Sequence, residues 1–174
     1  MPLYVIDSSI WIRLWENHPP DIFRDLWEQL DASIASGEIR SPEEVLYELQ
    51  RGTDILAETL EAREGLFVPL DGPLMTVVRE IVGRCVGLTD LEGERNRADP
   101  FVVALARLHN GVVVTDERPR RGQLGGRKSQ IVALSSAFSG LTGLGFCELC
   151  ELVVGDCRGD VNWQGSRILD AGQA

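Results

Sequence analysis

Positively charged residues are scarce in this sequence. It has 17 lysine and arginine residues against 27 aspartate and glutamate residues, a formal net charge of −10. This is the wrong sign for a protein that wraps nucleic acid over its whole surface. The sequence also lacks an apolar run near the roughly 18 residues of a membrane helix, a basic opening segment typical of secretory signals and a G-x-x-x-x-G-K-[ST] motif. We therefore expect no membrane span, no secretory signal and no P-loop.

Cysteine is scarce too, with four residues in a chain of 174. A chain of this length with 44% hydrophobic residues can bury a core without disulfides. We therefore expect one reduced, cytoplasmic domain over residues 1–174. Cys147-x-x-Cys150 has the spacing of half a zinc site, but a structural zinc ion needs four ligands. We interpret both cysteines as buried core residues.

Short apolar runs alternate with segments of helical periodicity. The runs at 3–6 and 112–115 predict strands buried on both faces of a parallel sheet. Weaker strand patterns lie at 66–68 and 130–134, and residues 39–41 read as a brief extended link. Helices are expected to follow Asp7 and to cover residues 22–34, 42–51, 54–64, 73–86 and 100–109. This alternation predicts a three-layer α/β/α fold with a central parallel sheet.

Two of the helix starts carry local capping signals. Ser41 is expected to cap the helix beginning at Pro42, with Glu44 completing a capping box. Asp99 is expected to cap the helix beginning at Pro100.

Acidic residues follow both strong strand patterns. Asp7 ends the first apolar run and Asp116 ends the second, and ligand sites in open parallel sheets lie at that edge. Asp99 opens the helix before the second run, and Glu48 lies on a short helix. Each acid also has a purely structural interpretation, as a helix cap or a solvated side chain. Together, however, ionised carboxylates need a counter-charge, and oxygen-only ligands favour Mg²⁺ or Mn²⁺.

One segment departs from the acidic composition. Residues 118–128 contain five basic residues and no acid. Either this is a solvated loop, or it is a loop that contacts phosphates beside Asp116. The candidate RNA-binding residues are Arg118, Arg120, Arg121, Arg127 and Lys128.

Four short motifs resemble those of PIN domains, in the order of that family. YVIDSSIWI resembles the first motif, with Asp7; VLYELQRG the second, with Glu48; RADPFVVALA the third, with Asp99; and VVVTDE the fourth, with Asp116. The third and fourth are most similar to a bacterial PIN-like subgroup of poorly defined function. The resemblance implies a PIN-like fold and Mg²⁺- or Mn²⁺-dependent hydrolysis of RNA phosphodiester bonds, commonly by the toxin of a toxin–antitoxin pair.

The resemblance also implies roles for these side chains. Asp7 and Asp99 are the main metal ligands, Asp116 binds directly or through water, and Glu48 holds a second metal or positions the attacking water. Ser8 is expected to touch a phosphate oxygen at a helix start, and Thr115 to support the ligands from the strand end.

The sequence departs from the PIN pattern at two places. Many PIN enzymes carry a further aspartate shortly after the fourth acid, where this chain has Arg118, Pro119 and Arg120 and leaves only Glu117. Glu44, one helical turn before Glu48, competes with it as the second acid.

Two other functions stay open. One is a non-catalytic binding module with the same fold. The other is a different Mg²⁺-dependent phosphate hydrolase; haloacid-dehalogenase-type phosphatases also place an aspartate after the first strand, but they need a second one where this chain has Ser9. The expected partners are RNA, an antitoxin with a basic segment and a second copy of this chain. Trp11, Trp15 and Trp27 lie on apolar helix faces and are expected to pack in the core or at such an interface.

Overall fold

The computed structural model describes residues 3–52, 54–84, 97–116 and 142–144. Its described strands form one parallel sheet in the order β3-β2-β1-β4-β5. They are β1 (Tyr4–Ile6), β2 (Ile39–Pro42), β3 (Phe67–Val68), β4 (Val112–Val114) and β5 (Thr142–Leu144). The expected strand at 130–134, the basic segment 118–128, Glu117 and the cysteines lie outside the described residues.

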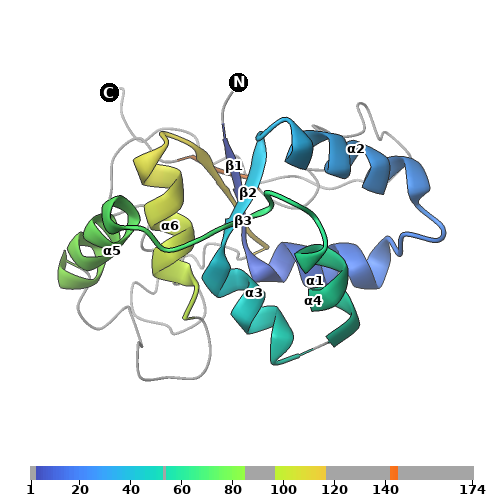
Figure 1. Ribbon diagram of the computed structural model, residues 1–174, viewed down its shortest axis with the longest axis horizontal. Helices are drawn as coiled ribbons and strands as arrows, with labels where there is room; N and C mark the ends of the chain where they lie inside the picture. The colour runs from blue at the N-terminus through green and yellow to red at the C-terminus, as the bar shows by residue number, and fades with distance from the viewer. Residues whose placement is uncertain (1–2, 53, 85–96, 117–141, 145–174) are drawn as a thin grey trace, which may run out of the picture.

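Helices cover both faces of this sheet (Figure 1). One side carries α1 (Ser8–Asn17), α2 (Arg24–Ala35), α3 (Glu43–Gln50) and α4 (Asp54–Glu61). The other side carries α5 (Gly72–Arg84) and α6 (Asp99–Leu108). The three-layer α/β/α fold predicted from the sequence is therefore confirmed. Within the described part of the chain, no helix is long and apolar enough to cross a membrane.

The core lies against the two central strands. Val5, Ile6 and Val114 have no exposed surface, as expected for a parallel strand covered on both faces. Residues 39–41, read from the sequence as a link, belong to strand β2, which pairs with β1 and with β3. Arg40, Ser41 and Pro42 leave this segment without an apolar run, so the sequence shows no strand pattern there, and its neighbours in the sheet decide its conformation.

Both predicted helix caps are wrong. Pro42, still in strand β2, is the N-cap of α3, and its helix has no side-chain cap. The Ser41 hydroxyl instead donates to the Ile6 carbonyl (2.8 Å) and accepts from Trp11 Nε1 (3.0 Å). Those buried groups have no access to water, so the hydroxyl satisfies them rather than a helix end. Asp99 is the first residue of α6, and Ala98 is its N-cap.

The strand order brings the ends of β1 and β4 together. The two strands pair with Ile6 opposite Val114, and the Asp7 amide continues the ladder by donating to the Val114 carbonyl (3.0 Å). Within the sheet, β2 and β3 lie on one side of β1, and the later strand β4 lies on the other side of β1. The carboxyl ends of β1 and β4 therefore form a topological switch point, where α/β folds characteristically bind ligands.

Candidate functional site

Asp7 lies at the centre of the switch point. It is the N-cap of α1, and Oδ1 accepts from the Ser8 backbone N–H (2.7 Å). Oδ2 accepts from the Ser9 hydroxyl (2.6 Å) and the Thr115 hydroxyl (3.2 Å). The side chain is 4% exposed. The carboxylate is therefore oriented by donors from both the first helix and the end of β4.

Burial has a clear electrostatic consequence for this carboxylate. Loss of contact with water raises the pKa of Asp7 above its usual value of 3.8, although the hydrogen bonds from Ser9, the Ser8 backbone and Thr115 oppose that rise. Burial dominates, so the ionised form is less favourable here than in water. A nearby cation would offset this penalty and keep the carboxylate charged.

Glu48 connects two helix starts that are far apart in the sequence. Its Oε2 accepts from the Ser8 hydroxyl (2.9 Å), and its Oε1 accepts from the Ala98 backbone N–H (3.0 Å). Ala98 is the N-cap of α6, so Glu48 supplies from another helix the contact that an N3 glutamate makes in a capping box. The Ser8 hydroxyl, for which a phosphate contact is predicted, lies within hydrogen-bond distance of Glu48 and Asp7.

Asp99 of the third motif and Glu44, just before the second motif, lie close to this bridge in the chain. Asp99 follows Ala98 directly and is 4% exposed at the first position of α6. Glu44 is one turn before Glu48 on α3. Burial raises the pKa of Glu44, a nearby Glu43 adds to the rise, and Oε2 is buried without a hydrogen-bond partner among the described residues. The two glutamates therefore differ: Glu48 forms the bridge and Glu44 does not.

Asp116 lies on the outer side of the same network. Its backbone N–H donates to the Ser9 hydroxyl (3.2 Å), and its Oδ1 forms an ion pair with Nη1 of Arg13. Ser9 thus joins Asp7 to Asp116. Ser9 and Arg13 were not predicted as site residues, yet helical spacing was a usable signal. The two residues are one turn apart on α1, so they share the face that meets the end of β4.

A family model described as "Domain of unknown function (DUF4411)" matches residues 4–139. This chain belongs to that family. The matched range contains Asp7, Glu48, Asp99 and Asp116, so the candidate site is part of the DUF4411 domain. No curated protein matches the chain.

The DUF4411 site offers oxygen atoms of the kind that bind a hard cation, but its described side chains are not already grouped around a metal position. Among residues in the described ranges, no three acidic, histidine or cysteine side chains are grouped so that they could hold a metal ion. The donors at the switch point are nonetheless all oxygens, which suit Mg²⁺ and Mn²⁺. The buried carboxylate of Asp7 and the buried Oε2 of Glu44 are the kinds of atoms that a cation would stabilise. By donor type and burial, the residues fit such an ion.

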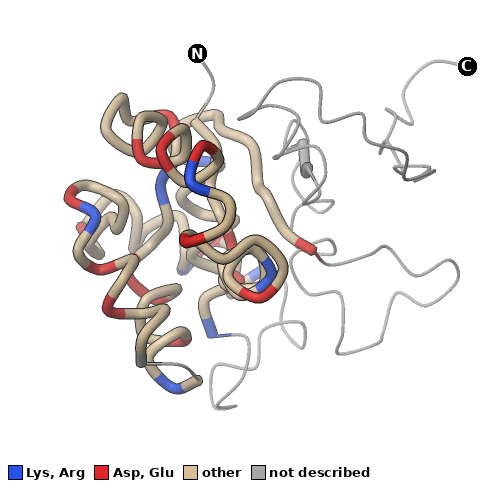
Figure 2. Tube along the Cα trace, turned by 90° about the vertical axis from the view of Figure 1, so that its right-hand side faces the viewer, with Lys and Arg blue, Asp and Glu red and all other residues tan. Residues whose placement is uncertain are grey.

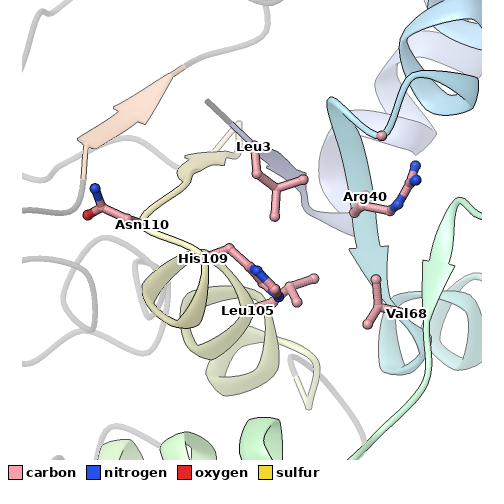
Figure 3. Close-up of a pocket in the computed structure, with 7 residues that line it drawn as sticks. Leu3, Arg40, Val68, Leu105, His109 and Asn110 are labelled. Atoms are coloured by element: carbon pink, nitrogen blue, oxygen red, sulfur yellow. The ribbon is translucent and has the colours of Figure 1, made fainter. Parts of the chain in front are cut away.

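A pocket of about 730 Å³ lies at the opposite edge of the sheet (Figure 3). Its lining includes Leu3 before β1, Leu105 on α6 and His109 just after that helix. Arg40 also contributes, but its Nη1 donates to the Ile34 and Ile39 carbonyls and so ties down the neighbouring turn. None of the described residues that line it carries a carboxylate. The pocket therefore does not share the chemistry of the switch point.

Proposed function

We propose that this DUF4411 protein is a PIN-like, Mg²⁺- or Mn²⁺-dependent endoribonuclease. One observation carries the proposal: a single hydrogen-bond network joins all four PIN-like motifs. Asp7 is bonded to Thr115 of the fourth motif, and Ser8 of the first motif is bonded to Glu48 of the second. Glu48 in turn is bonded to Ala98, beside Asp99 of the third. The motifs are far apart in the chain, so their meeting at a ligand-binding edge supports a shared role.

Some of these residues would hold the ion, and the others position those that do. Asp7 and Asp99 would hold the cation, and a bound cation would offset phosphate charge and lower the pKa of a water ligand. Glu48 keeps the starts of α1 and α6 together, so the backbone that carries both acids stays in register. Ser9 and Thr115 fix the orientation of the Asp7 carboxylate. Such preorganisation is what a phosphodiester hydrolase requires.

The proposal extends to the biological setting. The protein would act in the cytoplasm as the toxin of a toxin–antitoxin pair. A basic antitoxin segment would suit a chain of net charge −10. A homodimer remains part of the expectation. The basic segment 118–128 would contact the RNA backbone, adding positive charge next to Asp116.

A non-catalytic binding module is the second candidate. It is favoured by the ion pair between Arg13 and Asp116, because Asp116 then receives its counter-charge from within the chain. The lack of a grouped metal site among the described residues points the same way. A phosphatase that forms an aspartyl-phosphate is disfavoured, because Ser9 occupies the place of its second aspartate and is bonded to Asp7.

Metal binding and RNA cleavage by matched variants test the proposal. The parent protein, Asp99→Asn and the control Asp25→Asn, an exposed residue on α2, are titrated with Mn²⁺ by calorimetry and incubated with labelled RNA. We expect the parent and the control to bind Mn²⁺ and to cut RNA only with Mg²⁺ or Mn²⁺. Asp99→Asn should lose cleavage and bind Mn²⁺ more weakly. A parent that binds no Mn²⁺ and leaves RNA intact would establish the non-catalytic module instead.

A further inference from the structure

Arg13 is a basic side chain at the margin of an otherwise acidic site. It projects from α1 to the carboxyl end of β4, where its Nη1 pairs with Oδ1 of Asp116. Both side chains are about one-third exposed, at 32% and 35%. The pair is linked to the buried carboxylate of Asp7 through Ser9, which bonds to both aspartates. Arg13 therefore lies where the hydrogen-bond network reaches solvent.

The exposure of this ion pair means that it is readily exchanged. Ion pairs in contact with water contribute little to stability, because water and salt screen them and ordering both side chains costs entropy. An arginine at such a position can leave a carboxylate for another anion at small cost. Its planar guanidinium matches phosphate oxygens in two-point geometry, which makes it a better phosphate ligand than a lysine.

An RNA phosphate at this site would need a positively charged side chain nearby. The chain as a whole is acidic, and Figure 2 shows acidic positions spread along the described helices with basic positions between them. A phosphate that approaches Asp7 and Asp99 meets negative charge. A guanidinium within the same hydrogen-bond network supplies positive charge at the place where a phosphate would bind.

We propose that Arg13 is a phosphate-binding residue of this site, held by Asp116 until a phosphate of single-stranded RNA replaces the carboxylate. The inference rests on the proposed function, because it takes RNA as the ligand. It predicts opposite effects for the two partners of the ion pair. Loss of Arg13 removes a phosphate contact, whereas loss of the Asp116 charge releases Arg13 to make that contact.

Fluorescence anisotropy with a labelled single-stranded RNA tests this directly. The measurements are made in EDTA, which prevents cleavage and leaves only contacts made by the protein itself. Arg13→Met should bind about fivefold more weakly at about 0.1 M salt, and its salt dependence should flatten by about 0.7 of a log unit per log unit of salt, as expected for one lost contact. Arg24→Met replaces an exposed arginine on α2 and is the matched control. Its affinity for RNA should be closer to that of the parent than the affinity of Arg13→Met is.

A variant at Asp116 distinguishes a direct phosphate contact by Arg13 from a general effect of removing negative charge. Asp116→Asn should bind RNA more tightly than the parent, and the gain should vanish when Arg13→Met is added. A gain that persists in the double variant would mean that removal of negative charge alone is responsible, and would overturn the inference. Arg13→Lys, which keeps the positive charge, should retain most of the salt dependence. Arg13→Gln, which loses the charge but can still donate to Asp116, replaces Arg13→Met if that variant does not fold.

The failure of each proposal has its own signature. If the parent binds RNA and Arg13→Met binds equally well with the same salt dependence, Arg13 is only a structural tie between α1 and β4, and this inference alone falls. If the parent binds no RNA in EDTA yet cuts RNA with Mg²⁺ or Mn²⁺, this inference alone falls. If the parent neither binds RNA in EDTA nor cuts it with either metal, the proposed function falls and this inference with it. Thermal unfolding of every variant confirms that binding is compared between folded proteins.

Discussion

The bridge formed by Glu48 allows a quantitative prediction about stability. Glu48→Ala removes the acceptor of the Ala98 backbone N–H, which belongs to a fully buried residue. An unsatisfied buried donor costs about 1–3 kcal/mol. The Ser8 hydroxyl loses its 2.9 Å partner but keeps Asp7 Oδ1 at 3.3 Å, so its contribution is small. We expect a loss of about 2 kcal/mol in the free energy of unfolding.

Glu48→Gln separates the geometry of the bridge from its charge. A glutamine oxygen can still accept from Ala98, and its amide can donate to the Ser8 hydroxyl, which then turns its own proton toward Asp7. We expect this variant to lose less than about 1 kcal/mol. Glu58→Ala, at an exposed position on α4, is the control and should change stability by less than about 0.5 kcal/mol.

Urea unfolding followed by circular dichroism in EDTA measures all three differences. For a chain of this length, 2 kcal/mol corresponds to a fall in Tm of about 4–8 °C, which provides an independent check. Equal stability of Glu48→Ala and Glu58→Ala would refute the bridge. If Glu48→Gln were as unstable as Glu48→Ala, the negative charge rather than the two acceptors would hold the helix starts together.

Three further predictions follow from other contacts. Asp7→Asn should stabilise the metal-free protein at neutral pH. Burial raises the pKa of Asp7 above its usual value of 3.8, so the parent loses stability as the pH rises from 3.8 through the pKa of the folded state. The advantage of Asp7→Asn in thermal unfolding should therefore shrink in acid, and a pH-independent difference would contradict this. Ser41→Ala leaves Trp11 Nε1 and the Ile6 carbonyl unsatisfied and should cost about 1–3 kcal/mol, against almost nothing for the exposed Ser36→Ala; tryptophan fluorescence during urea unfolding measures both. A triple alanine variant in the basic segment should weaken RNA binding and flatten its salt dependence without changing Mn²⁺ binding, and parent-like binding across salt would place the RNA path elsewhere. The residues replaced are Arg120, Arg121 and Arg127.

Local pattern was enough for much of the architecture and for where the acids lie. Continuous apolar runs indicated β1 and β4, because strands buried on both faces cannot carry alternating polar residues. Asp7 and Asp116 follow those runs directly, and the carboxyl ends of parallel strands meet at one edge. Their common location could therefore be inferred before any side chain was placed.

Helix caps were predicted less consistently: Asp7 is the N-cap of α1, as its position before Ser8 indicated, but Ser41 and Asp99 are not caps. Capping depends on what else competes for a polar side chain. Ser41 has the identity and spacing of an N-cap, but its hydroxyl satisfies the Ile6 carbonyl and Trp11. Strand β2 was missed because Arg40, Ser41 and Pro42 leave it without an apolar run, and pairing with two neighbours imposes its extended form.

Only the tertiary structure decided how the acids are partnered. Glu48 meets Ser8 across 40 residues and Ala98 across 50, and Arg13 meets Asp116 across 103. Periodicity reports which face of an element is buried, but it carries no information on which distant side chain that face meets. Hydrogen bonds and ion pairs form within about 3–4 Å, so the relative placement of α1, α3, α6 and β4 had to be known before these partners could be named.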